Sequence, residues 1–149
     1  GATDRMPPAS SQFSFQLSAF SSSNVACLPY QPLDQLAGSL SAADLHVVVM
    51  GEAFVGLVHP CKIYNILSVA APVLYIGPRP SHLSEILDLI RNEHPCGSAA
   101  HGEVERVVEQ IQQVRRESGT FSRQVPTRVC SLFSKEVLLP RLIAELESS

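Results

Sequence analysis

The chain has 149 residues, long enough for one domain with a real hydrophobic core, and 45% hydrophobic against 17% charged residues exclude a disordered polymer. A formal net charge of -3 leaves no basic footprint for nucleic acid. No apolar run is long enough for a membrane span, because polar residues and Pro72 interrupt the densest stretch, residues 63–76.

The first third of the chain is expected to contain little regular structure. Residues 1–12 are polar and Pro-rich, and we expect them to be disordered or added by cloning, with the domain spanning residues 13–149. Residues 13–20, "FSFQLSAF", alternate apolar and polar and predict a strand, with a helix as the alternative. Residues 25–30, "VACLPY", predict a short buried strand. Leucines and alanine at helical spacing predict a helix over residues 33–43.

The middle of the chain alternates between strand and helix patterns. Residues 45–50, "LHVVVM", are nearly all apolar and predict a strand covered on both faces. After the loop of residues 51–60, a helix is expected at about residues 61–69, followed by a strand at residues 72–77. A second helix is predicted over residues 81–94, with Ser81 as its N-cap.

The last third is predicted to be mainly helical. Residues 96–102 predict a short strand or a loop, and residues 103–118 predict an amphipathic helix that stops at Gly119. Its apolar face comprises Val104, Val107, Val108 and Ile111. Residues 125–146 predict two helical pieces divided near Pro140. Because parallel strands need helical crossovers, the order of elements predicts an α/β fold: a Rossmann-like parallel sheet with helices on both faces.

The four cysteines are scattered and form no CxxC pair. We expect them to be buried free thiols in a reducing compartment, with disulfides as the alternative. The cysteines are Cys27, Cys61, Cys96 and Cys130. His59 lies near Cys61, but no further ligand has the spacing of a zinc site, so no metal is expected.

An anion site is predicted where the loop of residues 51–60 enters its helix. Ligands of doubly wound folds bind at the carboxyl ends of the strands. Pro60 suits an opening helical turn, whose unpaired N–H groups attract phosphate. Lys62 adds a cation that opposes the helix dipole unless an anion offsets it. The alternative is that Lys62 is simply solvated.

Four further residues are candidates for the same site. Gly56 would allow close approach of the backbone, and Arg79, held between two prolines, could reach the same anion. Asn65 could bond a sugar hydroxyl, and His59 a phosphate or hydroxyl; each could equally be an ordinary surface residue. The sequence has no GxSxG nucleophile motif and no glycine-rich phosphate motif. These residues alone therefore predict an α/β domain with an anion site.

Residues 24–78 resemble the C-terminal, donor-binding half of bacterial GT-B glycosyltransferases of family 4, the kind that builds cell-surface and capsular polysaccharides. The resemblance rests on "PYQPL", "SAAD" and "GLVHPCKIYNILSVAAPVLYIGP", and continues more loosely to the end of the chain. It implies a UDP- or GDP-linked sugar donor, no cofactor or metal, and a polysaccharide or lipid-linked acceptor. It also implies a missing N-terminal acceptor domain, a cytoplasmic location and peripheral membrane association through a longer parent protein.

The resemblance also implies roles for particular residues. Tyr30 would border the base, and residues 54–60 would lie against the sugar and diphosphate. That loop supplies Phe54, Gly56, Leu57, Val58, His59 and Pro60. Lys62 would be the catalytic cation that neutralises the leaving diphosphate, and Asn65 stands where many relatives have a glutamate that binds the ribose. Arg79 and Ser81 would lie in the loop that closes over the sugar.

Two departures from the family pattern leave other functions open. Asn65 lacks the charge of the usual glutamate, and Ala70 replaces a glycine, which suggests a less tightly turned helix end. The first alternative is a non-catalytic α/β nucleotide-binding or interaction module. The second is a fragment of a GT-B enzyme of the sugar-nucleotide epimerase type, which would want further histidines and glutamates in its cleft.

Overall fold

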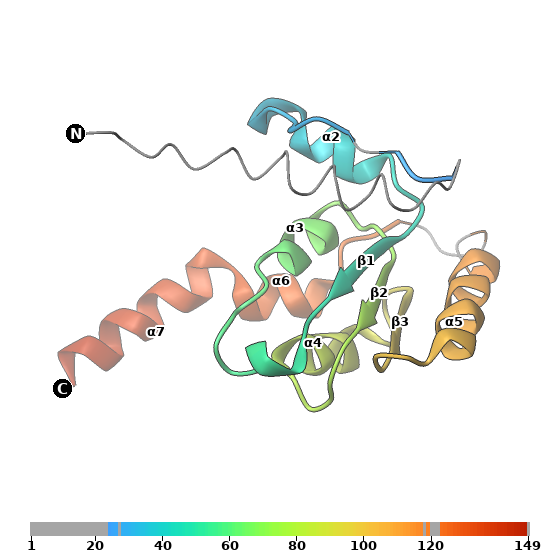
Figure 1. Ribbon diagram of the computed structural model, residues 1–149. Coiled ribbons are helices and arrows are strands. Elements are labelled where there is room, and N and C mark those ends of the chain that lie inside the picture. Colours follow the sequence, from blue (N-terminus) through green and yellow to red (C-terminus); the bar gives the residue numbers. More distant parts are fainter. Residues whose placement is uncertain (1–23, 27, 118, 120–122, 149) are drawn as a thin grey trace, which may run out of the picture. The chain divides into compact units, whose positions relative to one another are not determined.

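The computed structural model describes residues 24–26, 28–117, 119 and 123–148, and the chain divides into two compact units between Pro32 and Leu33 (Figure 1). Both predictions for residues 1–20 lie outside the described residues. The prediction of a buried strand over residues 25–30 is wrong at the described positions, because none is in a strand and Leu28 is 78% exposed. Pro29 has no N–H group, and its carbonyl accepts a bond from the Gln31 side chain instead of a neighbouring strand.

The second unit is built on a three-stranded parallel sheet. Its strands are β1 (His46–Val49), β2 (Val73–Ile76) and β3 (Cys96–Ala99), and β2 lies in the centre. His46 is in register with Val73, and Val73 with Cys96. The predicted α/β fold with a parallel sheet is therefore confirmed, and residues 96–102 begin with a strand rather than a loop.

Helices connect and follow these strands. They are η1 (Leu33–Gln35), α2 (Leu36–Ser41), η2 (Glu52–Phe54), α3 (Lys62–Ser68), α4 (His82–Ile90), α5 (Val104–Glu117), α6 (Thr127–Phe133) and α7 (Lys135–Glu147). The predicted cap of α4 is confirmed. The Ser81 hydroxyl accepts a hydrogen bond from the Ser84 N–H, and the Ser84 hydroxyl accepts one from the Ser81 N–H. In the part of the chain that the structure describes, no helix has the length and apolarity needed to cross a membrane.

The C-terminal helices divide at a different residue from the one predicted. Pro140 lies inside α7, whereas the break is at Ser134, which has extended backbone angles (φ −71°, ψ 151°) and precedes α7. The Ser134 carbonyl accepts the N–H groups of Val137 and Leu138, so a new helix starts there. Pro140 costs α7 one backbone bond without ending the helix.

The main core fills one face of the sheet. Val48, Val73 and Tyr75 point to this face and pack against α3 and α4. The helices contribute Ile63, Ile66, Leu67, Leu83, Ile86, Leu87 and Ile90, and α6 adds Val129. Burial of each large aliphatic side chain contributes roughly 1.5–3 kcal/mol, so this layer is the principal support for the loops at the sheet's carboxyl end.

The opposite face is only partly covered. Helix α5 packs over β3 and β2, burying Gln110 and Val114, and a Cβ at Gly97 would lie 2.5 Å from the Gln110 Oε1 atom. On β1, Val47 and Val49 remain 45% and 61% exposed. The prediction that this strand is covered on both faces is therefore wrong. Because β1 is at the sheet edge, α5 does not extend over it.

Candidate functional site

The three strands end at a common edge whose loops are joined by hydrogen bonds. The Met50 N–H donates to the Ile76 carbonyl (3.0 Å), and the Gly77 N–H donates to the Ala99 carbonyl (3.0 Å). The Nε2 atom of His101 lies 2.8 Å from the carbonyl oxygen of Met50. The loops after β1 and β2 are thus fixed to one another and to β3, at the place where ligands bind in parallel α/β sheets.

Two histidine side chains, from His59 and His82, lie within hydrogen-bonding distance of the Tyr64 hydroxyl between these loops. The Tyr64 hydroxyl lies 2.9 Å from His59 Nε2 and 3.0 Å from His82 Nε2, and the two imidazole centroids are 4.1 Å apart. The Tyr64 ring also contacts Phe133 at a centroid distance of 5.3 Å. Local sequence gave no signal for this cluster, because His82 is 18 residues from Tyr64 and starts a different helix.

Burial shifts the pKa values of two members of the cluster, His82 and Tyr64. It lowers the pKa of His82, an effect that the nearby His59 charge reinforces and Glu85 opposes. Burial also raises the pKa of Tyr64, and the neighbouring Cys61 adds to this. Both shifts favour the neutral forms, so at neutral pH His82 and Tyr64 form uncharged hydrogen bonds.

Lys62 and Asn65 lie one helical turn apart on the exposed side of α3. Both residues are exposed, and no ion pair joins Lys62 to another described residue. The side chain of Asn65 is likewise free of hydrogen bonds to the described residues, although its carbonyl accepts the Ser68 hydroxyl. A cation and an amide on neighbouring positions are therefore available to an anionic, hydroxyl-bearing ligand.

The backbone at the start of α3 differs from the expected anion seat. The N–H group of Cys61 donates to the His59 carbonyl (2.9 Å), that of Ile63 to Pro60 (3.2 Å) and that of Tyr64 to Cys61 (3.2 Å). The expectation of unpaired N–H groups is wrong at these three positions, because tight turns use their amides before the helix begins. An anion at this place would be held by side chains.

The thiols also differ in part from expectation. Cys61 and Cys96 are free, but Cys61 is exposed, so its predicted burial is wrong. It lies in the exposed turn that opens α3 rather than on the helix face that packs on the sheet. Cys96 is half-buried beneath α4, and burial raises its pKa to about 11.

The loop of residues 51–60 presents apolar side chains to solvent. Phe54 is 54%, Leu57 81% and Val58 51% exposed. The N–H groups of Leu57 and Val58 both donate to the Phe54 carbonyl, and Gly56 has a φ of 77°, a left-handed conformation that favours glycine. The turn therefore holds three apolar side chains outward beside His59 and Pro60.

The polar groups of the loop after β2 are engaged within the protein. Arg79 forms an ion pair with Asp88 and a 3.5 Å bond with Ser98, and the Arg79 bond is the main cause of the lowered pKa of Asp88. Ser81 is buried, caps α4 and lies 3.0 Å from the Tyr75 hydroxyl. Their roles toward a donor stay predictions, as does that of Tyr30, which belongs to the first unit and is 96% exposed.

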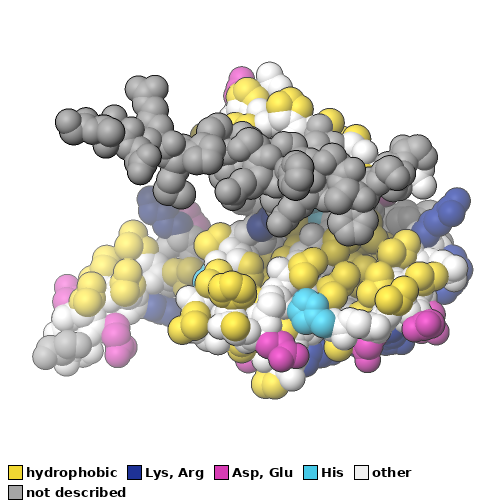
Figure 2. Space-filling view, viewed as in Figure 1, with side chains coloured by type: hydrophobic (Ala, Val, Ile, Leu, Met, Phe, Trp, Pro, Cys, Tyr) yellow, Lys and Arg dark blue, Asp and Glu magenta, His cyan; other side chains and the backbone are white. Residues whose placement is uncertain are grey.

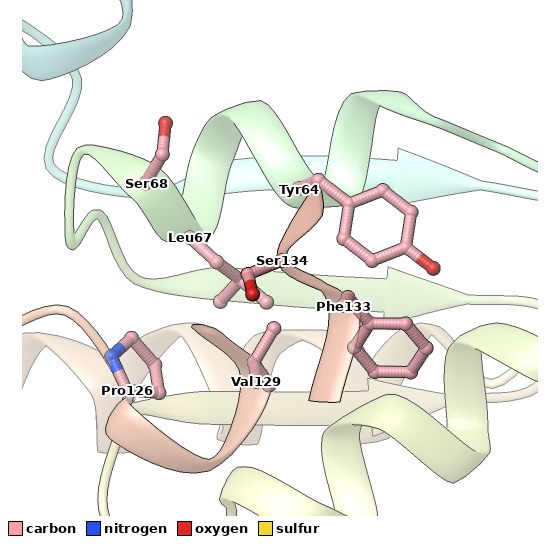
Figure 3. Close-up of a pocket in the computed structure, with 7 residues that line it drawn as sticks. All are labelled: Tyr64, Leu67, Ser68, Pro126, Val129, Phe133 and Ser134. Atoms are coloured by element: carbon pink, nitrogen blue, oxygen red, sulfur yellow. The ribbon is translucent and has the colours of Figure 1, made fainter. Parts of the chain in front are cut away.

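A small apolar groove lies on the other side of Tyr64, between α3 and α6 (Figure 3). Its volume is about 180 Å³, and its lining consists of Tyr64, Leu67, Ser68, Pro126, Val129, Phe133 and Ser134. The Tyr64 hydroxyl points away from the other lining side chains in Figure 3. Ligand pockets usually have roughly 300 Å³ or more, so this groove is too small for a nucleotide sugar.

Comparison with known proteins adds no assignment. No family model, curated protein or solved structure matches the chain. Among the residues that the structure describes, no group of three or more histidine, cysteine or acidic side chains could hold a metal ion.

Proposed function

We propose that the loops at the carboxyl end of the sheet form the donor-binding face of a glycosyltransferase that uses a UDP- or GDP-linked sugar. The observation that carries the proposal is the position of Lys62. It is an exposed cation without an ion-pair partner among the described residues, one turn from Asn65 and two residues before Tyr64, the centre of the His59–Tyr64–His82 cluster. If the resemblance of residues 24–78 to family 4 glycosyltransferases holds for ligand binding, the diphosphate of the donor would lie at this lysine.

The side chains present fit the chemical parts of such a donor. The Lys62 ammonium would offset the negative charge that builds on the diphosphate as the glycosidic bond breaks. Asn65 would bond a ribose hydroxyl, and the outward apolar side chains of Phe54, Leu57 and Val58 would cover the sugar or base. The acceptor would be a polysaccharide or lipid-linked sugar bound by a separate domain, in the cytoplasm or at the membrane's inner face. We therefore expect this chain alone to transfer no sugar.

The direct test is calorimetric titration of the folded chain with UDP, GDP and their sugar conjugates. Lys62→Ala should weaken binding at least about fivefold, the effect of losing ~1 kcal/mol from an exposed charge pair. The matched control is Lys135→Ala, since the chain's only other lysine is on α7 and should leave binding unchanged. Equal affinities for the two variants would contradict the role of Lys62.

A second candidate is a non-catalytic α/β interaction module, and α7 is the observation that favours it. Five large apolar residues on this helix are between 43% and 69% exposed: Leu138, Leu139, Leu142, Ile143 and Leu146. Such a stripe is unusual on a surface helix without a binding partner. A folded chain that binds none of the tested nucleotides would favour this candidate over the donor site.

A further inference from the structure

The outer edge of β1 has backbone hydrogen-bonding groups that no other described residue uses. The N–H groups of His46 and Met50 donate inward, to the carbonyls of Pro72 and Ile76 beside β2. Because the bonding direction alternates along a strand, the N–H and carbonyl groups of Val47 and Val49 point away from the sheet. No hydrogen bond from another described residue reaches them.

The side chains at this edge are also unprotected. Edge strands are normally guarded by lysine, proline or a bulge, yet β1 reads HVVV. Its exposed Val47 and Val49 lie on the face that α5 covers elsewhere, and α5 carries further exposed apolar residues: Val104, Val108 and Ile111. Leu45 and Ile111 line one surface hollow, so the two apolar areas adjoin. Figure 2 shows hydrophobic side chains gathered over β1 and the space between β1 and α5.

Three of the four residues of the predicted apolar face of α5 are therefore exposed, and they extend the exposed valine surface of β1. Parallel sheets are almost always buried on both faces, and an edge strand without charges favours pairing with another strand. The hydrogen-bonding groups of Val47 and Val49 require a polypeptide strand, rather than a helix or a small ligand, as the immediate neighbour.

Acidic side chains bracket the open edge. Asp44 precedes β1 with a fully exposed side chain that forms an ion pair with Arg123 (3.8 Å), and the exposed Glu52 follows the strand. In a twofold antiparallel pair of two copies centred on Val48, Asp44 of one copy would face Glu52 of the other. Like charges in that arrangement disfavour a second copy of this chain.

We propose that the β1 edge binds a β-strand of a partner polypeptide, with apolar residues at alternate positions and a basic residue at each end. Its backbone would pair with Val47 and Val49, and its apolar side chains would extend the valine surface beside α5. Its terminal cations would lie against Asp44 and Glu52. This inference is independent of the donor site, because it concerns the side edge of the sheet.

The experiment measures amide hydrogen exchange by NMR with a synthetic nine-residue peptide, Lys-Val-Thr-Val-Thr-Val-Thr-Val-Lys, whose central valines would lie opposite Val47 and Val49. Its terminal lysines match the spacing from Asp44 to Glu52. Saturating peptide should slow exchange at Val47 and Val49 about three- to tenfold, as expected for newly formed hydrogen bonds. Exchange at His46 and Met50, whose N–H groups are already bonded, should not change.

Two controls test the charges. The same peptide with glutamate at both ends should bind more weakly, and Asp44→Asn with Glu52→Gln should remove that preference. Glu136→Gln with Glu147→Gln, the matched change on α7, should preserve it. The proposal is overturned if Val47 and Val49 are already protected in the free monomer, or if protection rises with protein concentration alone, which would identify a second copy. It is also overturned if neither peptide slows their exchange.

Discussion

The end of α3 allows a sharp test of backbone strain. Ala70 has a φ of 52°, in the left-handed region, where a side chain costs roughly 1–2 kcal/mol relative to glycine. The Ala70 and Ala71 N–H groups donate to Leu67 and Ile66, closing the helix as a glycine normally does. The expectation that alanine here gives a less tightly turned helix end is therefore wrong. The tight turn forms and carries the strain.

The substitutions Ala70→Gly and Ala71→Gly separate this strain from other effects. Both residues are buried, with exposures of 6% and 0%, so each change loses about one buried methyl group, or ~0.8 kcal/mol. Each substitution also stabilises the unfolded chain by a similar amount, roughly 0.4–1 kcal/mol, because glycine gives that chain more conformational entropy. Only Ala70→Gly relieves a left-handed alanine. The Ala70→Gly variant should therefore be more stable than the Ala71→Gly variant by about 1–2 kcal/mol.

Urea unfolding followed by circular dichroism at constant pH would measure both free energies of unfolding. The wild-type protein is the common reference, and the slope of free energy against urea should be the same for all three proteins. Equal destabilisation by the two substitutions would refute the reasoning, since it would mean that the left-handed conformation of Ala70 carries no measurable cost.

Two further predictions concern buried polar groups. Burial lowers the pKa of His94 below its usual 6.5, although its ring bonds the Ala71 carbonyl. Because the folded pKa is lowered, the stabilisation from neutral His94 is fully present above about pH 6.5 and is lost as the pH falls through the folded pKa. Urea unfolding at several pH values should show this loss of unfolding free energy. The His94→Gln substitution should make the loss smaller. Ser81→Ala should cost about 1–2 kcal/mol of unfolding free energy, because α4 loses its cap and the Tyr75 hydroxyl loses a partner. Ser68→Ala, at an exposed serine on α3, is the control and should change stability little; an equal loss in both variants would contradict the capping argument.

Local patterns in the sequence identified most elements of the second unit. The apolar run before Gly51 and the run before Gly77 are β1 and β2, and Ser81 marked the start of α4 correctly. Such signals succeed because caps and side-chain periodicity act over a few neighbouring residues. The same local reasoning placed the break between the C-terminal helices at Pro140, because proline is unfavourable inside a helix. In the structure the break is at Ser134, and α7 continues through Pro140.

Only part of the candidate site could be predicted from the sequence. Lys62, Asn65 and the loop of residues 51–60 could be chosen because they precede or open a helix after a strand. The pairing of Tyr64 with His82, the ion pair of Arg79 with Asp88 and the use of the α3 amides depend on contacts or turn geometry that spacing does not encode.

The order of strands and helices, and hence the parallel α/β fold, was determined by the sequence alone, because crossover connections leave few other arrangements. Which surfaces are buried was decided only by the tertiary structure. Val47 and Val49 have the same apolar character as buried strand residues, but burial depends on what packs against them. In this unit α5 packs over β2 and β3 and leaves β1 open, so a sequence that reads as core becomes an exposed edge.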